Sequence, residues 1–152
     1  NAYGVDISDY AISNCPRDIS KNLAIIKNNN VVNALKKTNF KKKKFDWVIS
    51  KDVLEHIKPT DLNIILKQLS KITKKMFVIV PLGDNNKYRI KQYHLDKTHI
   101  VIKNEEWWIK LFERNNFKIE NIFYKVDGIK DKWYKYNKHG NGFFQIISKY
   151  KK

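Results

Sequence analysis

The stretch Phe45–Ile57, which reads FDWVISKDVLEHI, constrains the fold of this chain more than any other. Phe45 to Ile49 form a nearly continuous apolar run of aromatic and β-branched residues, which is typical of a central parallel strand covered on both faces. Ser50, Lys51 and Asp52 follow at the carboxyl end of that strand, where open α/β sheets bind their ligands. The stretch therefore predicts an α/β fold with a polar binding edge.

Composition sets the outer bounds of the interpretation. A chain of 152 residues is enough for one domain, and 42% apolar and 13% aromatic residues favour a globular chain over a disordered one. The sequence predicts no membrane span and no signal peptide. Its single cysteine, Cys15, excludes an internal disulfide. We therefore expect a cytoplasmic domain, and its oligomeric state stays open.

Two phrases of the sequence resemble class I S-adenosylmethionine-dependent methyltransferases of the small-molecule type. FDWVISKDVLEHI is similar to the family's fourth strand and following turn, FDxVxSxxVLEHI, and GVDIS at Gly4–Ser8 is similar to the end of its second strand. The resemblance covers most of the chain, from Tyr3 to Tyr150. It implies a Rossmann-like, mostly parallel sheet with helices on both faces and a closing antiparallel strand. It also implies S-adenosylmethionine as the cofactor.

The resemblance places the cofactor at the ends of three strands. Asp6 matches an acidic residue whose carboxylate can accept hydrogen bonds from both ribose hydroxyls; a helix N-cap is the alternative role for Asp6. Asn33, in the phrase VVNAL, stands where the family has Asp, and its carbonyl can still accept from the adenine amino group. VVNAL is otherwise an ordinary apolar strand. The expected cofactor-binding residues are Asp6, Ile7, Asn33, Ala34, Ser50 and Lys51.

The glycine-rich first motif of the family is missing from this sequence. It should lie upstream of Asp6, and none of the five glycines forms a strand, GxGxG turn and helix. We therefore expect a single methyltransferase-like domain over residues 1–152 that is incomplete at its amino end and, as given, binds the cofactor far more weakly than the intact protein. A lost central strand would leave two strand edges unpaired. The alternative is a non-catalytic remnant that keeps the fold.

The rest of the chain predicts an alternation of helices and strands. Helical spacing of apolar residues follows Pro59, and the apolar run Met76–Val80 predicts a parallel strand after a right-handed crossover. The connection 84–103 is long and polar, as substrate lids are. A helix capped by Asn104 follows it. The strands expected at Phe117–Tyr124 and Gly142–Tyr150 resemble the family's closing antiparallel pair, whose last strand inserts beside the fifth.

The lid contains the candidate catalytic and substrate-binding residues. Its phrase DKTH at residues 96–99, followed by NEEWW, is similar to small-molecule methyltransferases, in which the histidine faces the transferred methyl or braces the lid. His99 is therefore the expected general base, with a structural histidine as the alternative. Tyr93 and His94 are expected to bind the substrate. A metal trio of His94, Asp96 and His99 lacks i, i+4 spacing and a second ligand cluster, so no metal is expected.

The charge of the lid predicts the class of acceptor. Tyrosine hydroxyls and basic side chains favour a small hydroxylated or anionic acceptor of the sugar, nucleotide-sugar or phenolic type; the residues are Tyr88, Arg89, Lys91, Tyr93, His94 and His99. The net charge of +16 raises nucleic acid as an alternative partner. Only three of the 31 basic residues are arginine, the residue that reads guanine, so an AT-rich coding composition explains the charge better. The basic, aromatic segment 125–139 could stack nucleotides or form a solvated hairpin loop.

Overall fold

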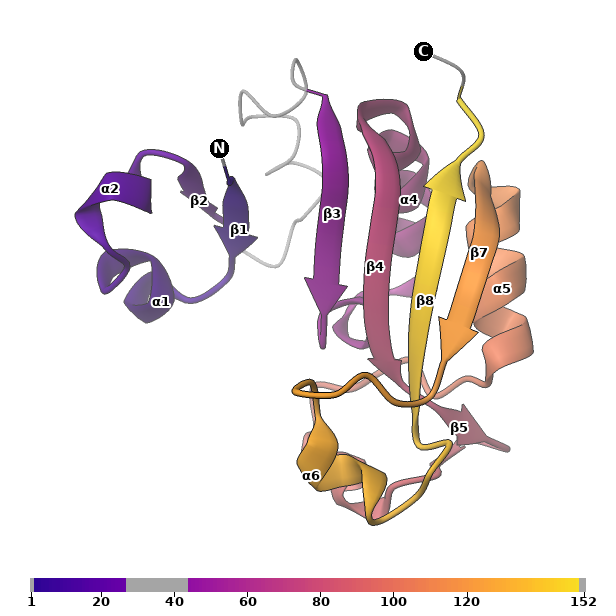
Figure 1. Cartoon of the computed structure of the whole chain (residues 1–152). Helices are drawn as coiled ribbons and strands as arrows, with labels where there is room; N and C mark the ends of the chain where they lie inside the picture. Colours follow the sequence, from indigo (N-terminus) through magenta and orange to yellow (C-terminus); the bar gives the residue numbers. More distant parts are fainter. Residues whose placement is uncertain (1, 27–43, 151–152) are drawn as a thin grey trace. The chain divides into compact units, whose positions relative to one another are not determined.

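The computed structural model describes residues 2–26 and 44–150 (Figure 1). It divides the chain into two compact units, Asn1–Lys43 and Lys44–Lys152, and each unit is described by itself. Two of the expected cofactor-binding residues, Asn33 and Ala34, lie outside the described residues. The strand expected around them is therefore neither confirmed nor contradicted.

Unit 1 pairs two short parallel strands and carries two short helices. Its elements are β1 (Gly4–Asp6), α1 (Asp9–Ser13), α2 (Arg17–Ser20) and β2 (Leu23–Ile25). Ser8, not Asp6, is the N-cap of α1, because its hydroxyl oxygen accepts from the Ala11 N–H at 3.1 Å. The Asp6 carboxylate accepts from the Ser8 N–H at 2.8 Å. The strand expected here is confirmed, and the N-cap alternative for Asp6 is wrong.

Unit 2 contains a four-stranded mixed sheet in the order β3-β4-β8-β7. Strand β3 runs parallel to β4, and β8 lies antiparallel between β4 and β7. The predicted insertion of the last strand beside the strand of Met76–Val80 is thus confirmed, as is the α/β class. The sheet strands and long helices are β3 (Phe45–Lys51), α4 (Pro59–Ile72), β4 (Thr73–Pro81), α5 (Glu105–Arg114), β7 (Phe117–Phe123) and β8 (Asn141–Ser148).

The main core lies between this sheet and the helices α4 and α5, which cover the same face (Figure 1). Every second residue of β4 points into this core, as strand geometry requires. The apolar residues of α4 recur at helical spacing and meet them, which is why the sequence pattern located this helix well. Fully buried side chains in the core include Leu62, Leu66, Met76, Val78, Val80, Trp108, Leu111, Phe112 and Phe144.

Strand β3 differs from the expectation of a strand covered on both faces. Among the described residues it pairs only with β4. Val48 packs against the core, whereas Trp47 and Ile49 keep 49% and 73% of their surface exposed. The alternation of side chains sends these two residues to the face opposite α4 and α5. The apolar run therefore predicted the strand correctly, and within unit 2 the helices α4 and α5 cover only one of its faces.

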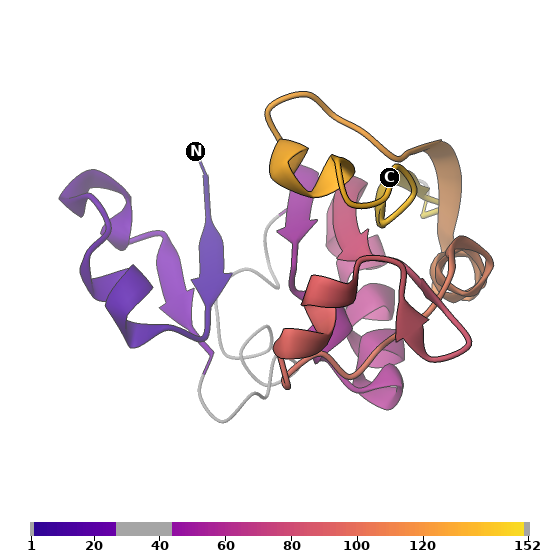
Figure 2. The same cartoon turned by 90° about the horizontal axis from the view of Figure 1, so that it is seen from below.

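The connection after β4 is a compact layer at the carboxyl end of the sheet. It forms a small hairpin and a 3-10 turn, and three of its side chains, Tyr88, Ile90 and Tyr93, make a second apolar cluster with Trp133. Figure 1 shows β5 and α6 at the end of the sheet where β3 and β4 finish, and Figure 2 views this end of the molecule from below. The elements are β5 (Gly83–Asp84), β6 (Lys87–Tyr88), η4 (Lys91–Leu95) and α6 (Asp131–Tyr134). No helix in residues 2–26 or 44–150 has the length and apolar character of a membrane span.

Candidate functional site

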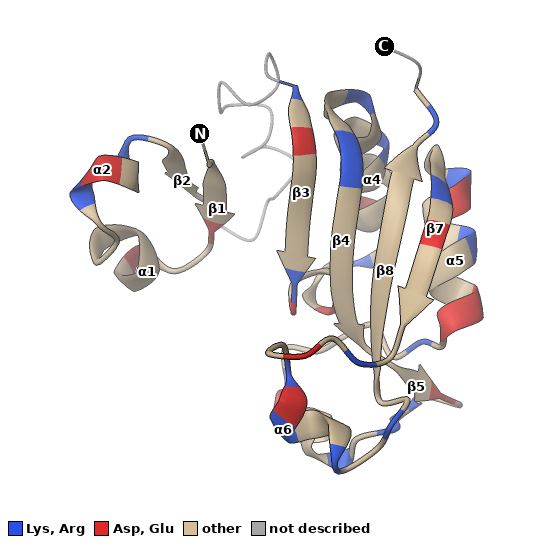
Figure 3. Ribbon diagram, in the orientation of Figure 1, with Lys and Arg blue, Asp and Glu red and all other residues tan. Residues whose placement is uncertain are grey.

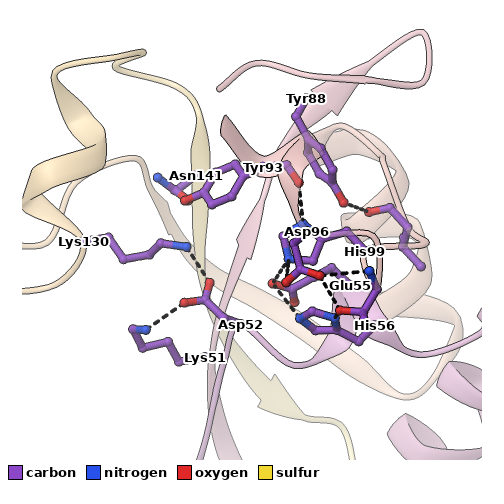
Figure 4. Close-up of polar contacts among 12 residues, drawn as sticks. Lys51, Asp52, Glu55, His56, Tyr88, Tyr93, Asp96, His99, Lys130 and Asn141 are labelled. Atoms are coloured by element: carbon purple, nitrogen blue, oxygen red, sulfur yellow. Dashed lines mark hydrogen bonds and ion pairs between the residues drawn. The ribbon is translucent and has the colours of Figure 1, made fainter. Parts of the chain in front are cut away.

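Polar side chains converge where β3 ends and the chain turns into η3 (Leu54–His56) (Figure 4). Asp52 makes this turn with a left-handed backbone, at a φ of 52°, and its N–H donates to the carbonyl of Ile79 on β4 at 3.0 Å. Such a conformation is uncommon outside glycine and is tolerated best by Asp and Asn. The turn therefore fixes the direction of the Asp52 and Glu55 side chains at the ligand-binding end of the sheet.

Asp52 joins β3 to the segment before α6 through an ion pair with Lys130. The Lys130 ammonium lies 2.5 Å from Asp52 Oδ1 and its side chain is only 4% exposed, while Lys51 contacts Oδ2 at 2.7 Å. Burial raises the pKa of Asp52, but the hydrogen bonds from both lysines outweigh it and leave the pKa below its usual value. Burial lowers the pKa of Lys130 more than Asp52 raises it. The basic segment 125–139 thus contributes a buried cation and is not merely a solvated hairpin.

Tyr93, an expected substrate-binding residue, forms an aromatic wall beside this ion pair. Its ring stacks on Trp133 at 4.8 Å between centroids, and Lys130 Nζ lies 4.7 Å from the ring centre. Its hydroxyl donates to Asn141 Oδ1 at 2.6 Å. Burial raises the pKa of Tyr93, so the phenol stays neutral. Tyr93 is buried and its hydroxyl is already bonded, so the side chain links Trp133 to Asn141.

Glu55 is the most unusual group of the site. Its side chain is 0% exposed, and neither carboxylate oxygen has a hydrogen-bond partner among the described residues. Its backbone carbonyl accepts from the N–H groups of Ile100 and Val101, both at 3.0 Å, which ties η3 to the end of the predicted lid. Burial raises the pKa of Glu55 to about 8. Perturbed carboxylic acids of this kind are typical of functional sites.

Two histidines face the Glu55 carboxylate. The Nε2 atoms of His56 and His99 each lie 4.0 Å from Glu55 Oε1, and the two ring centres are 4.6 Å apart. The side chain of His99 is 8% exposed, and burial, with a further contribution from His56, lowers its pKa. His99 Nδ1 donates to the carbonyl of Tyr93 at 3.1 Å. Only Nε2 of His99 is therefore available for chemistry.

Other residues of the predicted lid have structural contacts. The Arg89 guanidinium donates to Asp84 and to Glu105 at 2.6 to 3.1 Å, which together hold its pKa above the usual value. The Tyr88 hydroxyl donates to the carbonyl of Val101 at 3.2 Å. His94 Nε2 accepts from the Tyr88 N–H at 3.0 Å. Arg89 is thus not a free cation above the strand ends, and His94 does not join His99 in one cluster.

The expected cofactor residues are divided between the two units. Asp6 and Ile7 are exposed at the end of β1 in unit 1, and Ser50 and Lys51 end β3 in unit 2. Sequence reasoning missed Glu55, although its place after an apolar strand was a usable signal. It also missed Lys130 and Asn141, for which no local pattern exists.

The chain matches a sequence model described as a methyltransferase domain over residues 1–122. No curated protein matches it. Its fold is similar to that of a SAM-dependent methyltransferase from Archaeoglobus fulgidus, with a TM-score of 0.67, 16% identity, and coverage of 96% of this chain and 75% of that one.

Two further solved structures have the same fold at lower similarity. The mitomycin 7-O-methyltransferase MmcR aligns with a TM-score of 0.53, 15% identity, and coverage of 87% of this chain and 36% of that one. The methyltransferase CalO1 of calicheamicin biosynthesis, in its SAH-bound form, aligns with a TM-score of 0.52, 8% identity, and coverage of 88% and 37%. The chain thus spans little more than a third of the length of these two proteins. At such identities the likeness shows the fold alone.

Proposed function

The chain belongs to the methyltransferase-domain family, as predicted from its sequence, and we propose that it takes part in S-adenosylmethionine-dependent methyl transfer to a small hydroxylated or anionic acceptor. The match of the family over residues 1–122 is the observation that carries this proposal. The sulfonium of the cofactor supplies an activated methyl group, so the protein needs mainly to align an acceptor oxygen in line with it. We also propose that the protein acts in the cytoplasm.

Residues of both units suit the cofactor. The Asp6 carboxylate is exposed at the end of a parallel strand, where it can accept from ribose hydroxyls. In unit 2, Ser50 and Lys51 end β3, and Lys51 is half-exposed beside Asp52. We propose these residues, with Ile7, as parts of the cofactor site. Asn33 and Ala34 remain predictions from the resemblance.

The acceptor class follows from the groups around the β3 end. The aromatic wall of Tyr93 and Trp133, with the Lys130 ammonium against it, suits a sugar or phenolic ring that bears hydroxyl or acidic groups. Figure 3 shows the basic residues of unit 2 interspersed with acidic ones over its strands and helices. Extended nucleic acid needs a continuous basic stripe, so this distribution favours a small acceptor.

His99 is the proposed general base in protein without a bound cation. Its Nε2 is the nitrogen that can take the proton from an acceptor hydroxyl, since Nδ1 donates to the Tyr93 carbonyl. Replacing His99 by Gln should lower kcat in chelator-treated protein by about 10²- to 10⁴-fold, the usual contribution of a general base. The exposed His139, outside this cluster, gives the matched control His139→Gln. An unchanged kcat in His99→Gln would leave His99 as a structural brace.

Cofactor binding and methyl transfer by the intact protein test the proposal. Calorimetry should show S-adenosylmethionine binding that Asp6→Ala weakens by about 1 to 3 kcal/mol, the range for charged hydrogen bonds. Asp9→Ala, a neighbouring exposed carboxylate in the first turn of α1, should bind normally. Transfer to a panel of small acceptors is then compared with transfer to bulk RNA at two ionic strengths. Salt-resistant activity on RNA alone would contradict the acceptor class, and absence of cofactor binding would favour a non-catalytic remnant.

A further inference from the structure

The buried carboxylate of Glu55 needs a partner that the described protein groups do not supply. A carboxylate at 0% exposure, with neither oxygen hydrogen-bonded, carries a large desolvation cost. Two groups can offset that cost: a proton on the carboxylate, or a cation held against it. A cation site requires that other ligand atoms point at the same place, and the neighbours of Glu55 show whether they do.

The hydrogen bonds around His56 assign its tautomer. Thr98 Oγ1 lies 2.6 Å from Asp96 Oδ1 and 2.8 Å from His56 Nδ1. A carboxylate oxygen can only accept, so the single hydroxyl hydrogen of Thr98 is donated to Asp96. Thr98 Oγ1 must then accept from His56 Nδ1–H. The Nε2 of His56 consequently carries a lone pair, and it lies 4.0 Å from Glu55 Oε1.

The same reasoning applies to His99. Its Nδ1 contacts a backbone carbonyl oxygen, that of Tyr93, which can only accept, so Nδ1 carries the hydrogen. The Nε2 lone pair of His99 therefore also points toward Glu55 Oε1 at 4.0 Å. Two imidazole lone pairs and one carboxylate oxygen thus converge, and none of these three atoms can donate a hydrogen bond to another in the unprotonated cluster. Second bonds that fix ligand tautomers in this way are typical of metal sites.

A fourth candidate ligand atom, a second carboxylate oxygen, lies beside His99. Asp96 Oδ2 is 3.5 Å from His99 Nε2, and Asp96 is held by both the N–H and the hydroxyl of Thr98. The arrangement offers two imidazole nitrogens and two carboxylate oxygens (Figure 4). Two carboxylates also give the charge that neutralises a divalent cation. Imidazole with carboxylate is a ligand set suited to zinc and its neighbours in the first transition row.

We propose that Glu55, His56 and His99, with Asp96 as a fourth ligand, form a binding site for a divalent transition-metal cation of the zinc class. The ligand atoms of Glu55, His56 and His99 all lie within 4.8 Å of one another. Tetrahedral zinc with bonds of about 2.0 to 2.2 Å needs ligand atoms about 3.3 to 3.6 Å apart, so side-chain movements of about 1 Å bring the atoms of Glu55, His56 and His99 to that spacing. The side chains of His56 and Asp96 are 31% and 46% exposed, which gives the cation a path of entry.

This site differs from the trio of His94, Asp96 and His99 weighed from the sequence. His94 is engaged with the Tyr88 N–H, and its place is taken by a carboxylate and a histidine from the turn after β3. The two halves come together because the Glu55 carbonyl accepts from Ile100 and Val101 N–H. Ligands separated by more than 40 positions were not recognisable as a cluster in the sequence.

A bound cation and a general base would use the same Nε2 lone pair of His99. The two proposals are therefore tested in different preparations, the base role in chelator-treated protein and the cation site by direct binding. Cation binding needs neither cofactor nor acceptor. Failure of one proposal can thus be distinguished from failure of the other.

Zinc binding to the intact, chelator-treated protein tests the site. We expect calorimetry and metal analysis after dialysis to show one tightly bound Zn²⁺ per chain and a raised Tm, with no comparable effect of Mg²⁺, which prefers oxygen ligands. Glu55→Gln and His56→Gln should each weaken zinc binding by more than about 100-fold. Thr98→Val removes both the acceptor of His56 Nδ1–H and the hydroxyl that donates to Asp96, and should cost about 10- to 100-fold. His139→Gln, at an exposed histidine, should bind as the unaltered protein does.

Two results would overturn the proposal: zinc bound no more tightly than to an exposed histidine, or unchanged binding in both Glu55→Gln and His56→Gln. Thermal unfolding without cation shows whether each variant is folded. His56 is partly exposed, so His56→Gln provides a folded test even if the buried Glu55→Gln does not fold. Wild-type binding by a folded His56→Gln variant would exclude the proposed ligand set.

Discussion

Arg89 and Glu55 are two ionisable groups at the same end of the sheet, and they differ in how their polar atoms are satisfied. Arg89 donates to two carboxylates, Asp84 and Glu105, and to the carbonyl of His139, while its side chain is 20% exposed. Glu55 is fully buried and its carboxylate has no hydrogen-bond partner among the described residues. The polar atoms of Arg89 are satisfied by other protein groups. Those of Glu55 would be satisfied only by a bound proton or cation.

The difference separates structural from functional polar groups. A satisfied network stabilises the fold and fixes the segments that it joins, here β5, α5 and the end of the 125–139 segment. An unsatisfied buried group lowers stability, and a role in binding or chemistry is one reason for its presence. Substitutions in the two centres should therefore change different observables, unfolding for Arg89 and ligand binding for Glu55.

The largest effect on folding is expected from Arg89→Gln. The change leaves Glu105, which is 19% exposed, and Asp84 without their cation, and a broken ion-pair network of this kind costs about 3 kcal/mol of unfolding free energy. Urea denaturation measures it. Arg114→Gln, at an exposed arginine that donates to Asn63, should change little. A loss below about 1 kcal/mol in Arg89→Gln would contradict the claim that the Arg89 network stabilises the fold.

The elements of both centres were largely predictable from local patterns. Three local patterns predicted elements correctly: the apolar run from Phe45 predicted a strand, the spacing of Leu62 and Leu66 predicted a helix, and Asn104 predicted the start of a helix. The partners of those elements were not predictable, because they depend on contacts across the fold. Trp47 is an example. A large aromatic side chain in an apolar run predicts burial, but Trp47 lies on the face of β3 that α4 and α5 do not cover.

The second largest effect on the free energy of unfolding is expected at the Asp52–Lys130 ion pair, which is intermediate between the satisfied network of Arg89 and the unsatisfied Glu55. Lys130→Met removes a 4% exposed ammonium from a carboxylate that is 31% exposed, and should cost about 2 kcal/mol, within the range for charged hydrogen bonds. Lys51→Met removes the other cation from the same carboxylate. Because Lys51 is 50% exposed, it should cost less than about 1 kcal/mol. Equal losses in the two variants would show that burial does not set the strength of these contacts.

The site itself shows the limit of sequence reasoning. His99 was identifiable from its phrase, but the residues that it faces come from other segments: Glu55 from the turn after β3 and Tyr93 from η4. Lys130, from the segment before α6, contacts Tyr93 and Asp52. Lys130 has a left-handed backbone at a φ of 60°, which no local sequence pattern predicts. Such placements follow from tertiary packing, so only the structure brings them together.

A smaller effect is expected from Tyr93→Phe. The ring keeps its stack on Trp133, but Asn141 Oδ1 loses the hydroxyl that donates to it, which should cost about 1 kcal/mol of stability. Tyr136→Phe, at a tyrosine that is 51% exposed, is the control. If Tyr93 also binds the acceptor, its variant should raise KM, and an unchanged KM would leave its role structural.

The smallest effect on folding, and the sharpest test of the comparison, is expected from Glu55→Gln in chelator-treated protein. The amide has the shape of the carboxylate and brings two N–H donors to a place where the Nε2 lone pairs of His56 and His99 point. It replaces an unsatisfied acceptor with a group that can be satisfied, so the free energy of unfolding should change by less than about 1 kcal/mol and can rise. Glu106→Gln, at an exposed glutamate paired with Lys110, should leave stability unchanged.

Denaturation of Glu55→Gln with and without Zn²⁺ then tests the function of Glu55: the wild type should gain stability from zinc and the variant should not. A loss in cation-free Glu55→Gln as large as that in Arg89→Gln would mean that Glu55 is a structural group after all, and the distinction between the two centres would fail.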